Sequence, residues 1–224
     1  MDDDIWTLVI AIILVVAIIG VLLYVFYWLI TMQMKTFEIL FGNGWLYIAF
    51  FIAGLIFSLV NIPLYETEEL DEVYVNLGGC ILPLILTGYL LYKTWFLLNP
   101  IMFFVATLTT IAISRIVSWY KKGKGVLIAA IIVEIASTLI VHFLPFAVGY
   151  LDKDPLSLKL AFGYIIGTLG VLIGGDILHL GMIGRDGRWN DKLSIGGAGT
   201  KDGVWSIGLT IMLFVLLSHY IFGW

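Results

Sequence analysis

The stretch LAFGYIIGTLGVLIGGDILHLGMI, residues 160–183, decides how the chain is built. It is apolar from end to end except for Thr168, Asp176 and His179. A helix needs about 20 such residues to cross the ~30 Å hydrocarbon core of a bilayer, and it satisfies its backbone hydrogen bonds internally. The stretch therefore predicts a transmembrane helix that carries an acidic residue within it.

The composition of the whole chain supports the same interpretation. Of its 224 residues, 61% are hydrophobic and 12% are charged, whereas a soluble domain typically has about 25% charged residues. We therefore expect an integral membrane protein, with the lipid bilayer and a small solute or ion as partners. The net charge of −4 does not indicate nucleic-acid binding. The single Cys80 excludes an internal disulfide, and no cofactor is expected.

Seven apolar runs are candidate transmembrane helices, since a closed β-barrel would show short alternating segments instead. The sequence predicts an all-α, polytopic transmembrane helical bundle of about seven spans in one integral-membrane domain, residues 1–224. Residues 1–35 would add an extra N-terminal span. Asn99-Pro100 near the start of the fourth run is also compatible with a re-entrant segment. The runs are Ile5–Ile30, Trp45–Tyr65, Val73–Tyr92, Thr94–Ser114, Gly125–Leu151, Leu160–Ile183 and Gly203–Trp224.

Basic residues in short loops indicate orientation, because cytoplasmic loops carry more of them. With seven spans, eight of the 12 basic residues share the side of the N-terminus, which favours a cytoplasmic N-terminus. Lys35, directly after the first span, argues the other way. The eight are Arg115, Lys121, Lys122, Lys124, Arg185, Arg188, Lys192 and Lys201, and the others are Lys35, Lys93, Lys153 and Lys159.

Ionisable residues within the predicted spans are Glu134, His142, Asp176 and His179. Such residues are costly in a membrane and mark a functional site or a buried partner. Glu134, Thr138 and His142 form one polar stripe, and His179 shares a face with Asp176. We expect the fifth and sixth helices to face each other, so that Asp176 or Glu134 has a histidine partner or shares a proton. A structural cluster that fixes helix register is the alternative.

The glycine-rich loop SIGGAGTKDG, residues 194–203, could form a nest of backbone N–H groups that receives an anion, or serve as a flexible connector. Asp202 in this loop lies toward the same membrane face as Asp176. Two facing carboxylates that share a proton can activate water for peptide hydrolysis. Beside Lys201, Asp202 is equally compatible with a solvated loop residue.

Glycines of the sixth span form a small-residue stripe for close helix packing. On an unbroken helix Asp176 would point to the opposite face. Either this helix is buried on both sides, or Gly174-Gly175 breaks it and redirects the aspartate. The stripe consists of Gly163, Gly167, Gly170 and Gly174.

Two stretches resemble each other, LGGCILPL (77–84) and IGGDILHL (173–180), with five of eight positions identical. They lie on the third and sixth spans, which cross in opposite directions, as in an inverted repeat. Transporters built this way often bind substrate at interrupted helices near the midplane. Gly78, Gly79, Gly174 and Gly175 would then allow helix breaks at a central site. A chance match is the alternative, because these residue types are abundant in the chain.

Four motifs in order resemble a prokaryotic family, archaeal and bacterial, of multi-span membrane proteins catalogued as a domain of unknown function. They are NIPLY (61–65), VNLGGCILPL (75–84), GTLGVLIGGDILHL (167–180) and SIGGAGTKDG (194–203). The resemblance covers about residues 45–220 and leaves out the first span. It implies a prokaryotic cell membrane and a shared design that includes Asp176 and the loop, but no activity.

A looser resemblance is to intramembrane aspartyl proteases of the presenilin and prepilin-peptidase type, whose mark is Gly-x-Gly-Asp. Residues 173–176 read Ile-Gly-Gly-Asp, whereas the Tyr-Asp and Pro-Ala-Leu motifs are absent from the sequence.

The leading hypothesis is a multi-pass membrane protein that transports a small solute or ion, without being an enzyme. Asp176 and His179 would be the protonatable or cation-binding group, and no metal is specified. The rival is an intramembrane aspartyl hydrolase with Asp176 and Asp202 as catalytic residues. A third hypothesis is a non-catalytic membrane scaffold or lipid-binding protein. The candidate solute- or ion-binding residues are Asp176, His179, Gly174, Gly175, Gly78, Gly79, Glu134 and His142.

Overall fold

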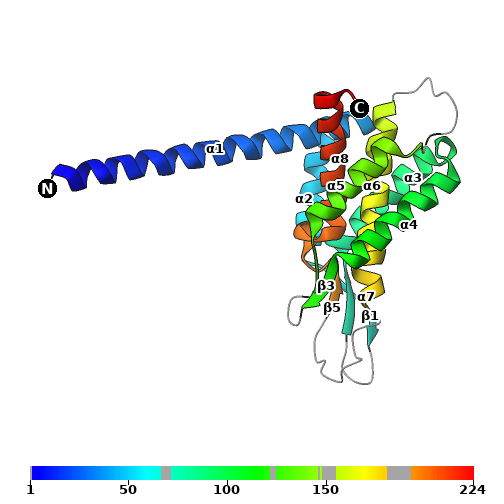
Figure 1. Ribbon diagram of the computed structural model, residues 1–224. Coiled ribbons are helices and arrows are strands. Elements are labelled where there is room, and N and C mark those ends of the chain that lie inside the picture. The colour runs from blue at the N-terminus through cyan, green and yellow to red at the C-terminus, as the bar shows by residue number, and fades with distance from the viewer. Residues whose placement is uncertain (1, 67–71, 122–124, 146, 148–154, 181–192) are drawn as a thin grey trace.

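The computed structural model describes the chain except for residues 1, 67–71, 122–124, 146, 148–154 and 181–192. It is a bundle of helices from which the first helix extends as a long arm (Figure 1). The helices are α1 (Asp2–Phe41), α2 (Trp45–Phe57), π-helix η1 (Leu77–Ile81), α3 (Leu82–Thr94), 3-10 helix η2 (Trp95–Leu97), α4 (Pro100–Ile116), α5 (Ala130–Phe143), α6 (Pro155–Gly170), π-helix η3 (Val171–Ile177), α7 (Leu178–Leu180), 3-10 helix η4 (Gly199–Lys201) and α8 (Gly203–Phe222). The strands are β1 (Asn61–Glu66), β2 (Glu72–Asn76), β3 (Ser118–Lys121), β4 (Gly125–Ile128) and β5 (Leu193–Ile195).

The centre of the bundle is formed by α6 and α8. In the most apolar 18-residue window of each helix, 78% of the residues are buried for Leu156–Leu180 and 61% for α8. The corresponding share for Ile10–Phe41 of α1 is 0%. The predicted glycine stripe is confirmed as a packing surface, because none of its glycines has room for a Cβ atom. A Cβ on Gly167 would lie 2.4 Å from Ile211 Cδ1 of α8, and one on Gly170 would lie 2.3 Å from Thr110 Cγ2 of α4. This helix is therefore buried on both sides.

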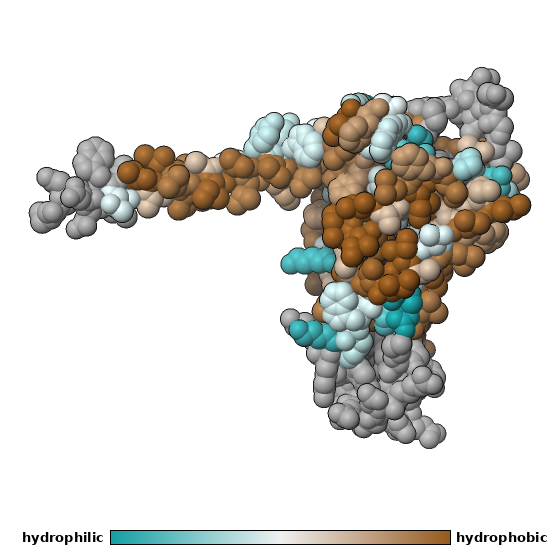
Figure 2. Space-filling model, in the orientation of Figure 1, coloured by the Kyte–Doolittle hydropathy of each residue, from teal (hydrophilic) through white to brown (hydrophobic). Residues whose placement is uncertain are grey.

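The predicted all-α helical bundle is confirmed. Of the described helices, four are long and apolar enough to cross a membrane, namely Ile10–Phe41, Leu77–Leu97, Leu156–Leu180 and Gly203–Phe222. Three shorter apolar helices, α2, α4 and α5, cover the other predicted runs. Apolar residues also dominate the outside of the arm and of the visible bundle face (Figure 2). This surface is that of a membrane protein, and the number of seven spans stays a prediction.

Short strands occupy the end of the bundle opposite to the junction with α1 (Figure 1). β2 pairs with β1 in antiparallel and with β5 in parallel orientation, and β3 pairs with β4 in antiparallel orientation. The predicted second, third and fifth runs are therefore wrong as continuous helices, because strands replace one end of each. A short apolar strand and the end of an apolar helix cannot be separated by hydrophobicity alone.

Two predicted boundaries also change. Lys35, expected in a loop, lies within α1, which continues to Phe41. The fourth run does not begin as a helix at Thr94, because α4 begins at Pro100. The Asn99 side chain accepts the N–H groups of Ile101 and Met102, and proline is favourable at the first helical position.

Candidate functional site

The two similar octapeptides adopt the same unusual local structure. Residues 77–81 form the π-helix η1, and residues 171–177 form the π-helix η3. Such turns are rare and frequently occur at functional sites. In each, the first glycine admits the backbone of a neighbouring helix. A Cβ added to Gly78 would lie 2.4 Å from the Gly54 carbonyl oxygen of α2. A Cβ added to Gly174 would lie 2.3 Å from the Ile111 carbonyl oxygen of α4.

The octapeptides do not have the arrangement of an inverted repeat. Residues 77–84 open the segment Leu77–Leu97, whereas residues 173–180 close the segment Leu156–Leu180. In an inverted repeat, matching residues lie equally far from the start of their spans. Because the two spans run in opposite directions, the matching residues then lie at opposite ends of the bundle. Here both octapeptides lie at the end that carries the strands. The two similar octapeptides therefore lie at the same end of the bundle.

A tight loop after β5 holds η1 and η3 together. Gly196 has a φ of +71°, which favours glycine, and its carbonyl oxygen would lie 2.0 Å from a Cβ on Gly79. The Gly196 backbone N–H lies beside the Asp176 carboxylate. The same residue thus contacts η1 through its carbonyl group and η3 through its amide group.

Asp176 lies in η3, next to the Gly174-Gly175 pair, and its side chain is half-buried. Its Oδ2 atom is buried and has no hydrogen-bond partner among the residues that the structure describes. A buried carboxylate oxygen without a partner carries a desolvation penalty of about 1–3 kcal/mol or more. Such an atom is a place where a proton, a cation or a water molecule can bind.

Asp202 supplies a second carboxyl group at this site. It caps α8, with Oδ1 accepting the Val204 N–H at 3.0 Å and Oδ2 accepting the Ala198 N–H at 3.4 Å. Burial raises the pKa of the Asp202 carboxyl, and the two N–H groups counteract this only in part. The charge of Asp202 acts on the Asp176 carboxyl. The structure therefore brings Asp176 and Asp202 together, and the glycine-rich loop directs its N–H groups at the chain's own carboxylates.

Cys80 occupies in η1 the place that Asp176 occupies in η3. Its side chain is 3% exposed, and both carboxyl charges of the site act on it. Its backbone nitrogen would lie 2.7 Å from a Cβ on Gly196. Within the described parts of the chain, no group of three or more His, Cys, Asp or Glu side chains is placed to hold a metal ion.

His179, predicted to act together with Asp176, contacts residues of α4 and β3. Its Nε2 atom lies 2.8 Å from Arg115 Nη1 and 3.5 Å from Ser118 Oγ, and the ring is buried. Since the Arg115 guanidinium is always protonated, it is the donor and Nε2 is the acceptor. The Arg115 contact explains the burial of His179 without a role in binding at Asp176.

Glu134 and His142 form the predicted stripe on α5, but they face α8 rather than Asp176. The Glu134 side chain lies beside Thr210, and His142 Nε2 lies 2.5 Å from Ser218 Oγ. The expected pairing of Asp176 or Glu134 with a histidine is therefore wrong, because each histidine has another partner. The stripe is a second polar region of the bundle.

Asn76 is a residue of the site that was not predicted. It is fully buried before η1, where its Oδ1 atom accepts the Gly79 N–H at 2.7 Å. Its Nδ2 atom donates to Ser58 O at 2.8 Å and to Asn61 Oδ1 at 3.0 Å. An asparagine directly before a helical segment is a capping signal that could have identified it.

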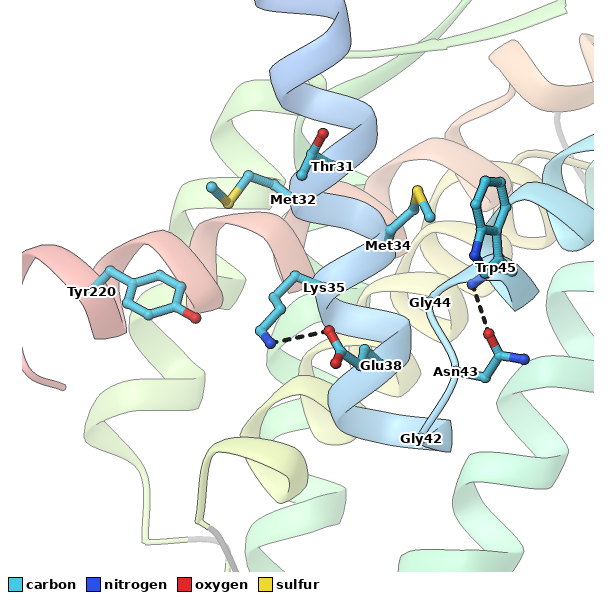
Figure 3. A pocket seen from close by; sticks show the side chains of 10 residues that line it. All are labelled: Thr31, Met32, Met34, Lys35, Glu38, Gly42, Asn43, Gly44, Trp45 and Tyr220. Carbon is cyan, nitrogen blue, oxygen red and sulfur yellow. Dashed lines mark hydrogen bonds and ion pairs between the residues drawn. The ribbon is translucent and has the colours of Figure 1, made fainter.

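A separate pocket of about 560 Å³ lies at the other end of the bundle, where α1, α2 and α8 meet (Figure 3). Lys35 forms a 3.0 Å ion pair with Glu38 there, with Tyr220 to one side and Trp45 to the other. Both charged side chains are about half exposed, so this pair adds little stability. In contrast to the Asp176 region, its charges are already paired with each other, and we do not assign the site here.

The comparisons with known proteins supply a family but no activity. Residues 49–214 match the family described as "Protein of unknown function (DUF1614)". The expected resemblance to a domain of unknown function, placed at about residues 45–220, is thereby confirmed. No curated protein and no solved structure matches the chain.

Proposed function

The chain belongs to the DUF1614 family of proteins of unknown function, and we propose that it binds a proton or a small cation at the Asp176–Asp202 pair. It moves this ion, alone or together with a small solute, across the bilayer. The membrane character of the helices supports a transport role, and the carboxyl pair supplies the binding group. No cofactor is required for this chemistry.

The observation that carries the proposal is the Asp176 Oδ2 atom, which is buried and lacks a hydrogen-bond partner within the described chain. A purely structural aspartate would use both oxygens, as Asp202 does at the start of α8. Two carboxylates that act on each other favour one shared proton, or a cation between them. Asp176 would therefore be the residue that loads and releases the ion.

The space beside Asp176 is consistent with this role. A Cβ added to Gly175 would lie 3.5 Å from Val171 Cγ1 and 3.8 Å from Ile128 Cδ1, which are its nearest atoms. These are ordinary contacts, in contrast to the closed packing at Gly79. η3 is therefore packed less tightly at Gly175 than η1 is at Gly79.

The test is flux in proteoliposomes that contain the purified protein and a pH-sensitive dye, with proton, Na⁺ and K⁺ gradients applied in turn. Asp176→Asn removes the charge at nearly constant volume and should abolish the flux. Asp176→Glu should retain part of it. Asp202→Asn should retain only part of it, because one carboxyl group of the pair is lost while asparagine still caps α8.

The result for Asp176→Asn separates the hypotheses. Unchanged flux would show that Asp176 is not the ion-binding group. The scaffold hypothesis would instead be supported if the wild type showed no flux under any gradient and Asp176→Asn only lowered the unfolding temperature.

Hydrolysis by the two carboxyl groups is a second candidate, and the electrostatic interaction between Asp176 and Asp202 favours it. This mechanism needs both residues, since one carboxyl group activates the water while the other supplies a proton. Cleavage of membrane-embedded peptides by the purified protein, abolished equally by Asp176→Asn and Asp202→Asn, would support it. Flux that survives in Asp202→Asn would argue for transport.

A further inference from the structure

Polar residues of α5 and α8 meet at two levels of the bundle. At the lower level the Glu134 side chain lies beside Thr210, and at the upper level His142 contacts Ser218. Glu134 and His142 are eight residues apart, and so are Thr210 and Ser218. At 1.5 Å per residue both spacings are about 12 Å. The two helices are therefore parallel, and their polar residues stay in register.

Further polar groups lie between and below these two levels. Ser137 and Thr138 of α5 lie between them, both buried, and Ser137 Oγ has no partner among the described residues. On α8, Ser206 lies one turn below Thr210, whose hydroxyl donates to the Ser206 carbonyl at 2.9 Å. One turn further down is Asp202, whose carbonyl accepts the Ser206 N–H at 2.8 Å.

These residues extend over most of the thickness of a membrane. From Asp202 to Ser218 the helix rises about 24 Å at 1.5 Å per residue, against a hydrocarbon core of about 30 Å. One end of the series is therefore the carboxyl pair, and the other lies near the C-terminal end of the bundle. We define the α5–α8 path as Asp202, Ser206, Thr210, Glu134, Ser137, Thr138, Ser218 and His142.

We propose that the α5–α8 path conducts protons between the Asp176–Asp202 pair and the opposite end of the bundle, with Glu134 as the intermediate carrier. The inference rests on the proposed function and names its ion as the proton. Hydroxyl groups can both donate and accept a proton, while a carboxylate and an imidazole can hold one. Glu134, with 8% of its surface exposed, is the group that a purely structural interface would not need.

Some hydroxyl groups of the α5–α8 path donate to a carbonyl of their own helix, but this does not explain all of its polar groups. Thr138 and Thr210 each donate to a carbonyl of their own helix, as such residues often do in membrane helices. The Ser137 hydroxyl and the Glu134 carboxyl are not explained in this way. At the far end, the charges of Lys159 and His219 act on His142. The other titratable groups on the helices packed against α5 are Arg115 of α4, Tyr164 of α6 and Tyr220 of α8.

The experiment measures proton flux in proteoliposomes with an imposed pH gradient, using the full-length protein. Glu134→Gln should abolish flux, and Glu134→Asp should restore part of it. A matched pair tests the hydroxyl groups. Thr138 and Thr107 are both 8% exposed and both donate to the carbonyl four residues earlier, but Thr107 lies on α4 outside the path. Thr138→Ala should lower flux severalfold, while Thr107→Ala should leave it unchanged.

The outcomes separate the path from the function. Flux retained in Glu134→Gln but lost in Asp176→Asn would overturn the path and leave the proposed function intact. A wild-type protein that conducts Na⁺ or K⁺ but not protons would also overturn the path alone. A wild type that conducts none of these ions would overturn both. If Glu134→Gln fails to fold, equal flux in the two threonine variants overturns the path.

Discussion

The π-helices η1 and η3 share a glycine pair but differ in the residue that follows it. In η1 that residue is Cys80, which is buried, and in η3 it is Asp176, which is half-buried. The second glycine differs as well. At Gly79 a Cβ would lie 2.0 Å from the Gly196 carbonyl oxygen, whereas at Gly175 the nearest atom would be 3.5 Å away.

This difference indicates a division of roles between two similar stretches. η1 is closed against the loop at Gly196 and holds it in place, while η3 presents its side chain to a less crowded space. The same local backbone thus packs closely at Gly79 and less closely at Gly175. Substitutions that change the packing or the side chain of η1 or η3 test this comparison.

The largest expected effect comes from alanine at the second glycine of each pair. Gly79→Ala places a methyl group against backbone, which cannot move aside as a flexible side chain would. Overpacking of this kind typically costs about 1–3 kcal/mol, and we expect the upper end or more. Gly175→Ala is the matched control, and it should unfold within about 1 kcal/mol of the wild type. Thermal unfolding in detergent measures both.

The outcome at Gly79 also tests the site. If Gly79→Ala folded as well as Gly175→Ala, the closed contact between η1 and the loop would not exist. The positioning of the Asp176 carboxylate by Gly196 would then need another explanation.

The sequence predicted the parts of this site that follow from composition and spacing. Apolar runs identified the helical bundle, and the cost of a charge in lipid singled out Asp176. The position of Asp202 after a glycine-rich loop on the same side made it a candidate partner of Asp176, with a solvated loop residue as the alternative. The helical bundle is confirmed, whereas the role of the two carboxyl groups stays a prediction.

What the sequence could not predict depends on tertiary contacts. His179 lies three residues from Asp176, but Arg115 of α4, distant in sequence, determines where its ring is held. The role of Gly196, which contacts both η1 and η3, depends on a loop whose path is set by the pairing of β5 with β2.

A smaller effect is expected when the thiol is moved from η1 to η3. In the native protein Cys80, 3% exposed, should react slowly with a hydrophilic maleimide. A variant that combines Cys80→Ala with Asp176→Cys should react faster by about tenfold or more, because thiol reactivity depends on access. Both proteins should label fully after denaturation in detergent, which controls for the reagent. Equal native rates would contradict the difference in access between the two π-helices.

The smallest expected effect concerns pH, and it sharpens the comparison because it should come from the carboxyl pair and not from Cys80. Burial raises the pKa of Asp202 in the folded protein above its ordinary value of 3.8, so the folded state holds a proton that the unfolded state has lost. Stability should therefore be highest below that value and fall as the pH rises through the folded-state pKa. Asp202→Asn should weaken this decline, while staying within about 0.5 kcal/mol of the wild type at low pH because asparagine still caps α8. Unfolding midpoints measured between about pH 4 and about pH 8 test this, with Cys80→Ala as the control that should keep the wild-type decline. A decline that is unchanged in Asp202→Asn but lost in Cys80→Ala would place the titrating group on the η1 side and reverse the assignment of roles.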